Sequence, residues 1–173
     1  MAELLTGLPP LEPLTAKLLI LGSMPGAASL AAQQYYAHPR NLFWPFVAEV
    51  FGFTPVPEDY AARVAALTRR GVAVWDVLHR CERPGSLDAA IVRSSEAPND
   101  FAAFLRRHPG VRAIALNGQA AHTAFLRHVI KPGLLGADAP PLIALPSTSP
   151  ANAGIPVAEK LSRWQALAGV LNG

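Results

Sequence analysis

The stretch Lys17-Leu18-Leu19-Ile20-Leu21-Gly22-Ser23-Met24-Pro25-Gly26 decides the fold. After its first residue it is an unbroken apolar run that stops at Gly22 and Ser23, the pattern of a strand buried on both faces. Such strands belong to parallel sheets that helices cover. The glycines and the proline that follow favour a tight turn, whose backbone amides could approach a carbonyl oxygen, a water or a phosphate. An ordinary strand-to-helix turn would have the same composition.

The rest of the chain alternates between short apolar runs and amphipathic stretches. The apolar runs predict strands at residues 17–21, 72–75, 112–116 and 142–145. The amphipathic stretches predict helices at residues 42–51, 57–70, 100–107, 118–130 and 157–171. Strands that alternate with helices form a parallel sheet with helices on both faces. We therefore expect the α/β class, as a three-layer α/β/α sandwich around a central four-stranded parallel sheet.

Length and composition favour one domain over residues 1–173, because 51% of the residues are hydrophobic and only 16% are charged. Residues 1–13 are expected to form a poorly ordered or draped lead-in, since their prolines oppose a helix. Cys81 is the only cysteine, which excludes an intramolecular disulfide and a four-cysteine metal site. No HExxH pair is present, so we expect no metal and no cofactor.

Two further properties bear on location and partners. No apolar run reaches the roughly 18 residues that span a bilayer, and no secretory signal is recognisable, so we expect a cytoplasmic protein with no membrane partner. The net charge of +3 permits nucleic-acid binding but does not require it.

The segments that follow the four expected strands are small, polar or rich in glycine and proline. They are residues 22–26, 76–86, 117–119 and 146–152. Because ligands bind outside the carboxyl ends of parallel strands, these segments predict a cleft.

An aromatic cluster follows the first of these segments. Planar rings stand there beside amide and cationic groups: Tyr35, Tyr36, Phe43 and Trp44 with His38, Arg40 and Asn41. This combination suits a pocket that stacks a nucleobase and reads its edge. The alternative is that the rings at positions 43 and 44 are core residues, which we expect for Trp44.

Residues 22–26 and the segment His38-Pro39-Arg40-Asn41-Leu42-Phe43-Trp44 resemble the first motif of the hypoxanthine-DNA glycosylase branch of the uracil-DNA glycosylase superfamily. Residues 75–78, with Arg83, Gly85, Ser86, Leu87 and Asp88 downstream, are similar to a later segment of that branch. So is the segment Pro146-Ser147-Thr148-Ser149-Pro150-Ala151-Asn152. The pieces occur in the family's order, from about residue 19 to residue 152.

The resemblance implies a uracil-DNA glycosylase-like domain and a monofunctional hydrolase. Such an enzyme flips a deaminated base out of DNA and cleaves its N-glycosidic bond, leaving an abasic site. The implied partner is DNA that contains a deaminated base, most directly hypoxanthine. We expect the protein to act as a monomer near the nucleoid.

The resemblance also implies roles for individual residues. Many superfamily members carry an acid or amide at the position of Met24, which cannot handle water, so the catalytic role falls to Asn41. The implied base pocket is Gly22, Ser23, Met24, Pro25, Tyr36, Phe43 and Asp76. The implied DNA contacts are Ser147, Thr148, Ser149, Pro150 and Asn152, with residues 150–152 as a wedge in the groove.

Alternatives remain for these roles. Asn41 could serve only to cap a helix, and Asp76 could be a structural carboxylate paired with Arg80 or Arg83. Residues 147–152 could be a plain surface turn.

Alternatives also remain for the function. Uracil enzymes often carry a histidine where this chain has Leu145, which disfavours efficient uracil excision. A uracil or G·U mismatch glycosylase, a non-catalytic binder of damaged DNA and a nucleoside hydrolase are the competing interpretations.

Overall fold

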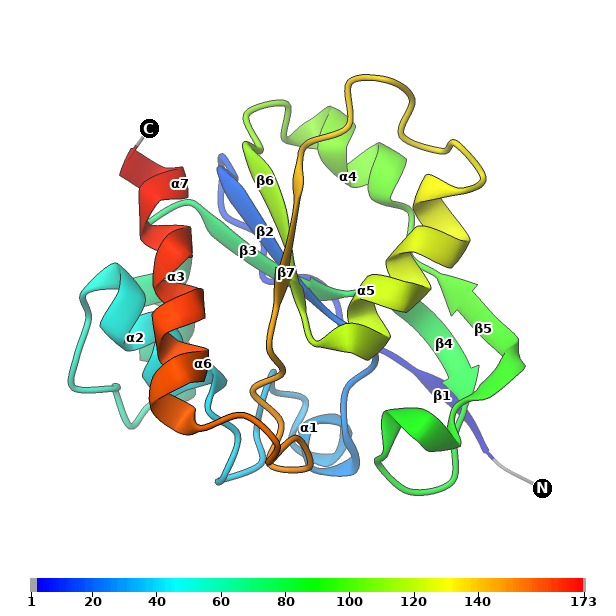
Figure 1. Ribbon diagram of the computed structural model, residues 1–173, viewed down its shortest axis with the longest axis horizontal. Coiled ribbons are helices and arrows are strands. Elements are labelled where there is room, and N and C mark those ends of the chain that lie inside the picture. The colour runs from blue at the N-terminus through cyan, green and yellow to red at the C-terminus, as the bar shows by residue number, and fades with distance from the viewer. Residues whose placement is uncertain (1–2, 173) are drawn as a thin grey trace.

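A four-stranded parallel sheet forms the centre of the protein, as the computed structural model of residues 3–172 shows (Figure 1). Its strands lie in the order β3 (Val72–Asp76), β2 (Leu18–Gly22), β6 (Ala113–Asn117) and β7 (Leu142–Leu145). The register pairs Gly22 with Asp76 and Asn117 with Leu145 at the carboxyl ends. The four parallel strands that the apolar runs predict are thereby confirmed.

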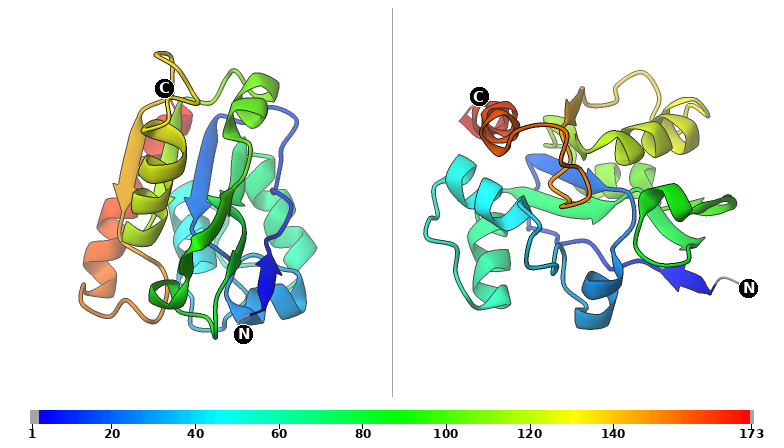
Figure 2. Two further views of the ribbon diagram at one scale, coloured as in Figure 1. Left: turned by 90° about the vertical axis from the view of Figure 1, so that its right-hand side faces the viewer. Right: turned by 60° about the horizontal axis from the view of Figure 1, so that its bottom comes forward.

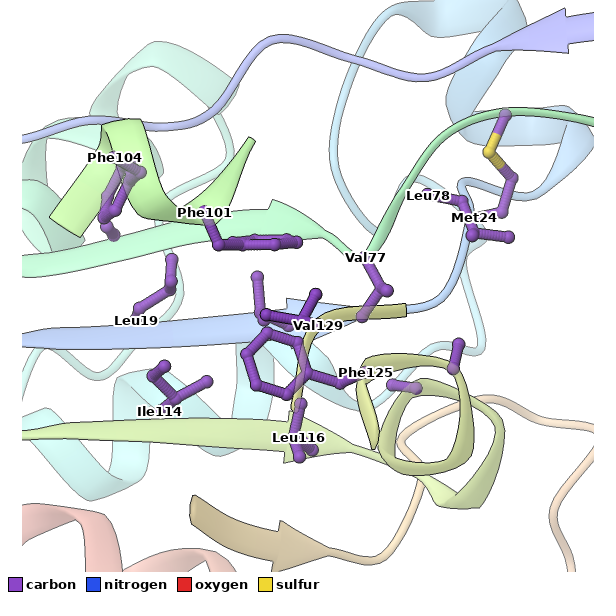
Figure 3. Packing of buried hydrophobic residues seen from close by; sticks show 14 of the residues in the cluster. Leu19, Met24, Val77, Leu78, Phe101, Phe104, Ile114, Leu116, Phe125 and Val129 are labelled. Carbon is purple, nitrogen blue, oxygen red and sulfur yellow. The ribbon is translucent and has the colours of Figure 1, made fainter. Parts of the chain in front are cut away.

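Both faces of this sheet are covered, which confirms the three-layer sandwich. Leu19 and Leu21 of β2 belong to the core on one face, where α4 (Phe101–Arg107) and α5 (Gln119–Phe125) pack. Figure 3 shows that core, in which Phe101 and Phe125 meet between the helices and the strands.

The opposite core has the alternate side chains of the same strand. Leu18 and Ile20 of β2 pack there against α2 (Phe43–Phe51), α3 (Tyr60–Thr68) and α6 (Val157–Trp164). Figure 1 shows these helices on the left of the sheet and α4 and α5 on the right.

The expected helices differ from the observed ones mainly at their ends. The helix expected at residues 57–70 begins only after Asp59, whose side chain accepts a hydrogen bond from Ala62 N and caps α3. The expected 118–130 helix is α5 followed by a π-helical turn at Leu126–Ile130. The last helix is α6, a 3₁₀ turn at Gln165–Leu167 and α7 (Ala168–Asn172).

A second, antiparallel sheet is not predicted by the sequence pattern. It has the order β1 (Leu4–Thr6), β4 (Leu78–Glu82) and β5 (Val92–Pro98). Figure 1 shows it at the right, beside α5. In β4 only Leu78 and Cys81 are buried, and β5 is polar, so neither strand shows the regular alternation that predicts a strand.

This sheet also corrects the interpretation of the first residues. The lead-in expected over residues 1–13 contains β1, and its Leu11 pairs with Val74 at an isolated bridge. Residues 1 and 2 lie outside the described part of the chain. The short helix α1 (Ala27–Ala32) is a further element that the pattern does not predict.

The carboxyl ends of the parallel strands point to one end of the molecule. In the left view of Figure 2 the arrows of β2 and β7 both point downward, toward the loops at the bottom of Figure 1. Within residues 3–172 no helix combines the length and apolar character needed to cross a membrane.

Candidate active site

A cavity of about 270 Å³ opens at the carboxyl ends of the parallel strands. We call it the carboxyl-end cavity. Its walls include Gly22, Ser23, Met24, Pro25, Tyr36, His38, Asn41, Asp76, Leu87, Asp88, Asn117, Ser147, Thr148, Ser149, Pro150 and Ala151. These residues follow the strands that neighbour one another in the sheet, at the position where α/β sheets bind ligands. His38 lies on the wall; His79, which the sequence also places near the expected cleft, is exposed on β4 and does not line the cavity.

The last residue of β2 is a glycine, Gly22, because the carboxylate of Asp76 lies against it. A Cβ atom on Gly22 would stand 2.6 Å from Asp76 Oδ1 and 3.0 Å from the Tyr36 hydroxyl, so a side chain does not fit. Val77 N donates to the carbonyl of Gly22 (2.8 Å), and Arg83 Nη2 donates to the carbonyl of Pro25 (2.7 Å). The loop is therefore fixed in place by the connection between β3 and β4 and by the residue after β4.

Asp76 is the most unusual charged group in the cavity. Its side chain is 4% exposed, and Oδ2 has no hydrogen-bond partner among the described residues. Burial raises the pKa of Asp76 to about 7; the negative charge of Asp88 adds to this, and Arg83 opposes it. The group therefore titrates near neutral pH.

The alternative of a structural ion pair for Asp76 is not formed. Within residues 3–172 no salt bridge joins Asp76 to Arg80 or Arg83. The guanidinium of Arg83 instead donates to the carbonyls of Pro25 and Gly85. A buried carboxyl with an unpaired oxygen, facing a cavity, is a candidate for contact with a ligand.

Asn41 lies on the cavity wall immediately before α2. Its Oδ1 accepts a hydrogen bond from Phe43 N (2.9 Å), although the residue at the N-cap position is Leu42. This bond orients the amide group and leaves Oδ1 with a second lone pair. Supporting the helix start and facing the cavity are thus compatible roles for one side chain.

In the aromatic cluster, Tyr36 forms part of the cavity wall and the buried ring of Phe43 packs behind it. Tyr36 lines the cavity, and its ring stacks on Phe43 at 4.0 Å between ring centroids with an interplanar angle of 14°. Phe43 itself is fully buried and does not line the cavity, which corrects the expectation that it forms part of the base pocket. Trp44 is a core residue, as expected, and its Nε1 donates to the carbonyl of Tyr35.

Tyr36 also has an unusual backbone and environment. Its φ of 55° lies in the left-handed region, which is uncommon for a residue with a ring side chain. Burial raises the pKa of its hydroxyl well above the usual range, with Asp76 adding to the effect. The hydroxyl accepts a hydrogen bond from Asn117 Nδ2 (3.2 Å).

The final loop, residues 146–152, is clamped by Asn117 at the end of β6. Asn117 Oδ1 accepts from Thr148 N, its Nδ2 donates to Thr148 Oγ1, and both distances are 3.0 Å. The carbonyl of Thr148 in turn accepts from Leu42 N (3.0 Å). Thr148 is fully buried, which differs from its expected place on the DNA-binding surface. The more accessible residues of this loop that line the cavity are Ser147, Ser149, Pro150 and Ala151.

A buried lysine on α6 also holds this loop. Lys160 is 2% exposed, and its Nζ donates to the carbonyls of Ser147 (2.9 Å) and Asn152. Burial lowers the pKa of Lys160. Asn152 does not line the cavity; its carbonyl serves this lysine instead.

Several of these supporting residues are not predicted from the sequence. Asn117 and Arg83 fall in expected cleft segments but outside the implied site, and Arg83 is also expected as a partner of Asp76. Asp88, whose Oδ1 accepts from Ser23 Oγ (2.5 Å), belongs to the stretch that resembles the family but has no role assigned from the sequence. Nothing in the local pattern distinguishes Lys160 from a solvent-facing residue of an amphipathic helix.

A second cavity, of about 360 Å³, lies at the other end of the sheet, and we call it the amino-end cavity. It lies between α4 and the segments that precede β6 and β7, and its walls include Leu105, Arg106, His108, Val111, Leu134, Leu135 and Asp138. His108 Nδ1 accepts from Ala16 N (3.2 Å), which leaves Nε2–H to donate to Glu12 (2.6 Å). Both nitrogens of this ring are used by the fold.

Comparison with known proteins identifies the family. The family model of the uracil DNA glycosylase superfamily matches residues 9–168. The chain therefore belongs to this superfamily, a family of DNA glycosylases, and the resemblance of the motifs to it is confirmed.

Individual relatives agree with that assignment. The hypoxanthine DNA glycosylase of Methanosarcina barkeri is 34% identical over 113 residues, which are 65% of this chain and 70% of that protein. The hypoxanthine DNA glycosylase of Methanosarcina acetivorans is 34% identical over 115 residues, 66% of this chain and 72% of that protein. A solution NMR structure of a proposed uracil DNA glycosylase from Methanosarcina acetivorans matches with a TM-score of 0.79 and 29% identity, covering 99% of this chain and 100% of that one.

Proposed function

We propose that this protein is a base-excision enzyme that removes hypoxanthine from DNA and uses Asn41 as its catalytic residue. The observation that carries the proposal is the buried carboxyl of Asp76, which lines the carboxyl-end cavity and whose Oδ2 has no hydrogen-bond partner among the described residues. The similarity to the two Methanosarcina hypoxanthine DNA glycosylases supports the choice of base.

The base would be read by one carboxylate and one loop. Hypoxanthine presents an N1–H donor beside its O6 acceptor. The ionised Asp76 accepts from N1–H, and backbone amides of the loop at Ser23 and Met24 donate to O6. Tyr36, backed by the buried ring of Phe43, provides a flat wall against which the flipped base stacks.

The last residue of β7 supports discrimination against uracil. Leu145 is buried and apolar, so it offers no hydrogen bond to the oxygen of a departing uracil anion. A purine does not depend on that bond, because it can leave after protonation at a ring nitrogen. The pocket is therefore better suited to a purine lesion.

Asn41 would act on the sugar rather than on the base. The C1′–N9 bond breaks with its electron pair moving to N9; water then adds to the oxocarbenium-like C1′, and its proton passes to the departing base, which leaves as neutral hypoxanthine. The amide oxygen of Asn41, held by Phe43 N, orients that water and stabilises the positive sugar. A weak base suffices when bond breaking runs ahead of water attack.

The surface around the cavity would bind the DNA backbone. Ser147, Ser149 and Pro150 line the mouth and are the contacts that we propose for phosphate and groove. Thr148 acts indirectly, since its N–H and its hydroxyl are bonded to Asn117. The backbone carbonyl of Asn152 is bonded to Lys160, and its side-chain amide stays a proposed DNA contact. The two cores share one sheet, which supports one domain.

A base-release panel tests the proposal. Duplexes that contain deoxyinosine, deoxyuridine or deoxyxanthosine are incubated with the enzyme and with Asn41→Ala, and abasic sites are cleaved with alkali. Release from the inosine duplex by the wild type is the expected result. Release from the uracil duplex alone would contradict the choice of base. Tight binding of inosine DNA without any release would favour a binder, and release from free deoxyinosine would favour a nucleoside hydrolase.

A further inference from the structure

One histidine of the carboxyl-end cavity has no part in reading the base edge or in supporting the loops. His38 is half-buried and lines the same cavity as Asn41. Its Nδ1 accepts a hydrogen bond from Arg40 N (3.1 Å), so the hydrogen of the neutral ring is on Nε2. Within residues 3–172 this Nε2 has no hydrogen-bond partner. The ring therefore brings one free N–H donor to the wall of the cavity.

The backbone around His38 holds the ring close to Asn41. Asn41 N donates to the carbonyl of His38 (3.0 Å), which closes a tight turn over residues 38–41. Pro39 occupies the second position of this turn, where its fixed φ is favourable. The imidazole and the Asn41 amide thus belong to one short turn, and a base whose sugar faces Asn41 comes within reach of His38.

The anchoring of this turn indicates which edge of the base the imidazole meets. Ala37 N donates to Ser29 Oγ on α1 (3.1 Å), and α1 follows directly after residues 22–26. The segment that carries His38 is thus anchored on the side of the loop whose amides donate to O6 in the proposed complex. On that edge of a 6-oxopurine, the acceptor next to O6 is N7. An N–H donor on this side of the cavity is therefore matched by N7.

The departing base needs such a donor, because the end of β7 supplies none. Leu145 is buried and apolar. When the C1′–N9 bond breaks, its electron pair moves to N9, and the charge is shared with N7 through the five-membered ring. A preorganised N–H aimed at N7 stabilises this charge as it develops.

We propose that His38 is a second catalytic residue, which donates its Nε2–H to N7 of the departing hypoxanthine. This inference rests on the proposed function, because it assigns a further group to the same reaction. The hydrogen stays on Nε2 throughout, the electron pair of the broken bond stays on the base, and the proton of the attacking water completes neutral hypoxanthine. Asn41 then acts on the sugar and His38 on the leaving group.

Single-turnover release of hypoxanthine measures the contribution of His38. We expect His38→Ala to slow release about 10²-fold, because it removes a donor aimed at the developing charge. His38→Gln should recover part of the rate, since its amide N–H can donate, whereas His38→Leu should not. The matched control is His79→Ala, which changes an exposed histidine outside the cavity and should match the wild type. Release by His38→Ala at the wild-type rate overturns the proposal.

Binding of a base analogue separates contact with N7 from any other role of His38. Duplexes with inosine or with 7-deazainosine, in which a C–H group replaces N7, are titrated with Asn41→Ala and with the Asn41→Ala, His38→Ala double variant. With His38 present, inosine should bind roughly threefold to tenfold tighter than 7-deazainosine, and the double variant should bind both equally. Equal affinities with His38 present overturn the proposal, and so does a preference that survives its removal.

The same titrations keep the two proposals distinguishable. If removal of His38 weakens both duplexes equally, the imidazole contacts the DNA backbone and not the base, which also overturns the inference. Absence of hypoxanthine release by the wild type contradicts the proposed function. The affinities in the Asn41→Ala background require no release, so they test the contact with N7 in either case.

Discussion

The amino-end cavity and the carboxyl-end cavity lie at opposite ends of the same sheet, and they differ in how their buried polar groups are bonded. The amino-end cavity has a volume of about 360 Å³ and the carboxyl-end cavity about 270 Å³. In the first, the buried His108 is fully bonded to Ala16 and Glu12. In the second, buried Asp76 keeps one oxygen unpaired. An unsatisfied buried group thus marks the candidate site, because such a group is costly unless a ligand uses it.

The largest expected difference between the two ends concerns Asn41. We expect Asn41→Ala to reduce single-turnover base release by roughly 10²- to 10³-fold, because it removes a preorganised dipole next to the developing charge. Affinity for inosine-containing DNA should change little, since few phosphate contacts are affected. Both quantities are measured on one labelled duplex. Normal turnover by this variant would show that Asn41 only supports the start of α2.

The second expected effect is the pH dependence that Asp76 confers. If the ionised group accepts from N1–H, kcat/KM rises through a pKa of about 7. One such titration gives roughly a tenfold gain between about pH 6 and pH 8. Asp76→Asn should remove the rise. A rate that instead falls as pH rises would show that the protonated acid donates to the base.

The same group predicts a pH-dependent stability. The pKa of Asp76 is about 7 in the folded protein against an ordinary value of 3.8, so between these pH values the folded chain binds more protons than the unfolded chain. The free energy of unfolding should fall as pH rises through this window, by an amount on the order of 4 kcal/mol. Urea unfolding at about pH 5 and pH 8 measures most of it, roughly 2.7 kcal/mol, because about 2 pH units of the window lie between pH 5 and the folded-state pKa. Asp76→Asn should flatten the dependence and be the more stable protein at the higher pH.

A smaller effect is expected where the final loop is held from α6. Lys160→Met has a similar length but cannot donate to the carbonyls of Ser147 and Asn152. We expect kcat/KM to fall roughly threefold to tenfold as the loop loses its fixed position. Limited proteolysis should then cut within residues 146–156. Unchanged activity together with unchanged protease resistance would mean that Asn117 alone holds the loop.

The smallest effect on activity belongs to the amino-end cavity. His108→Leu leaves Ala16 N without its buried acceptor, which should cost roughly 1–3 kcal/mol of stability and lower Tm. At a temperature where the variant is folded, base release should equal that of the wild type. A large loss of activity there would remove the distinction between the two cavities.

The sequence predicts the parallel sheet and the location of the site better than it predicts the antiparallel sheet and the buried residues that hold the site's loops in place. The strand at Leu18–Gly22 is visible because four consecutive apolar residues need burial on both faces. Asn41 and Asp76 stand at helix and strand ends, where topology alone brings them together. The strand at Leu78–Glu82 cannot be predicted from its own residues, since its pairing depends on a distant segment, β1.

The ring cluster and the buried lysine show a second limit. Sequence places Phe43 and Tyr36 in one aromatic segment, but which ring faces the cavity depends on the left-handed backbone at Tyr36. Lys160 belongs to a polar helix face in the sequence, and its burial arises only after residues 146–152 fold over it. Tertiary contacts between separate segments decide both cases.

Because Lys160 is buried under the final loop, its reactivity reports how often that loop opens. The chain has three lysines, and the other two, Lys17 and Lys131, are exposed. An amine-reactive label should therefore modify Lys17 and Lys131 at once and Lys160 only when the final loop lifts. The ratio of the slow to the fast modifications in one mass spectrum then gives the fraction of time the loop is open, without a mutation.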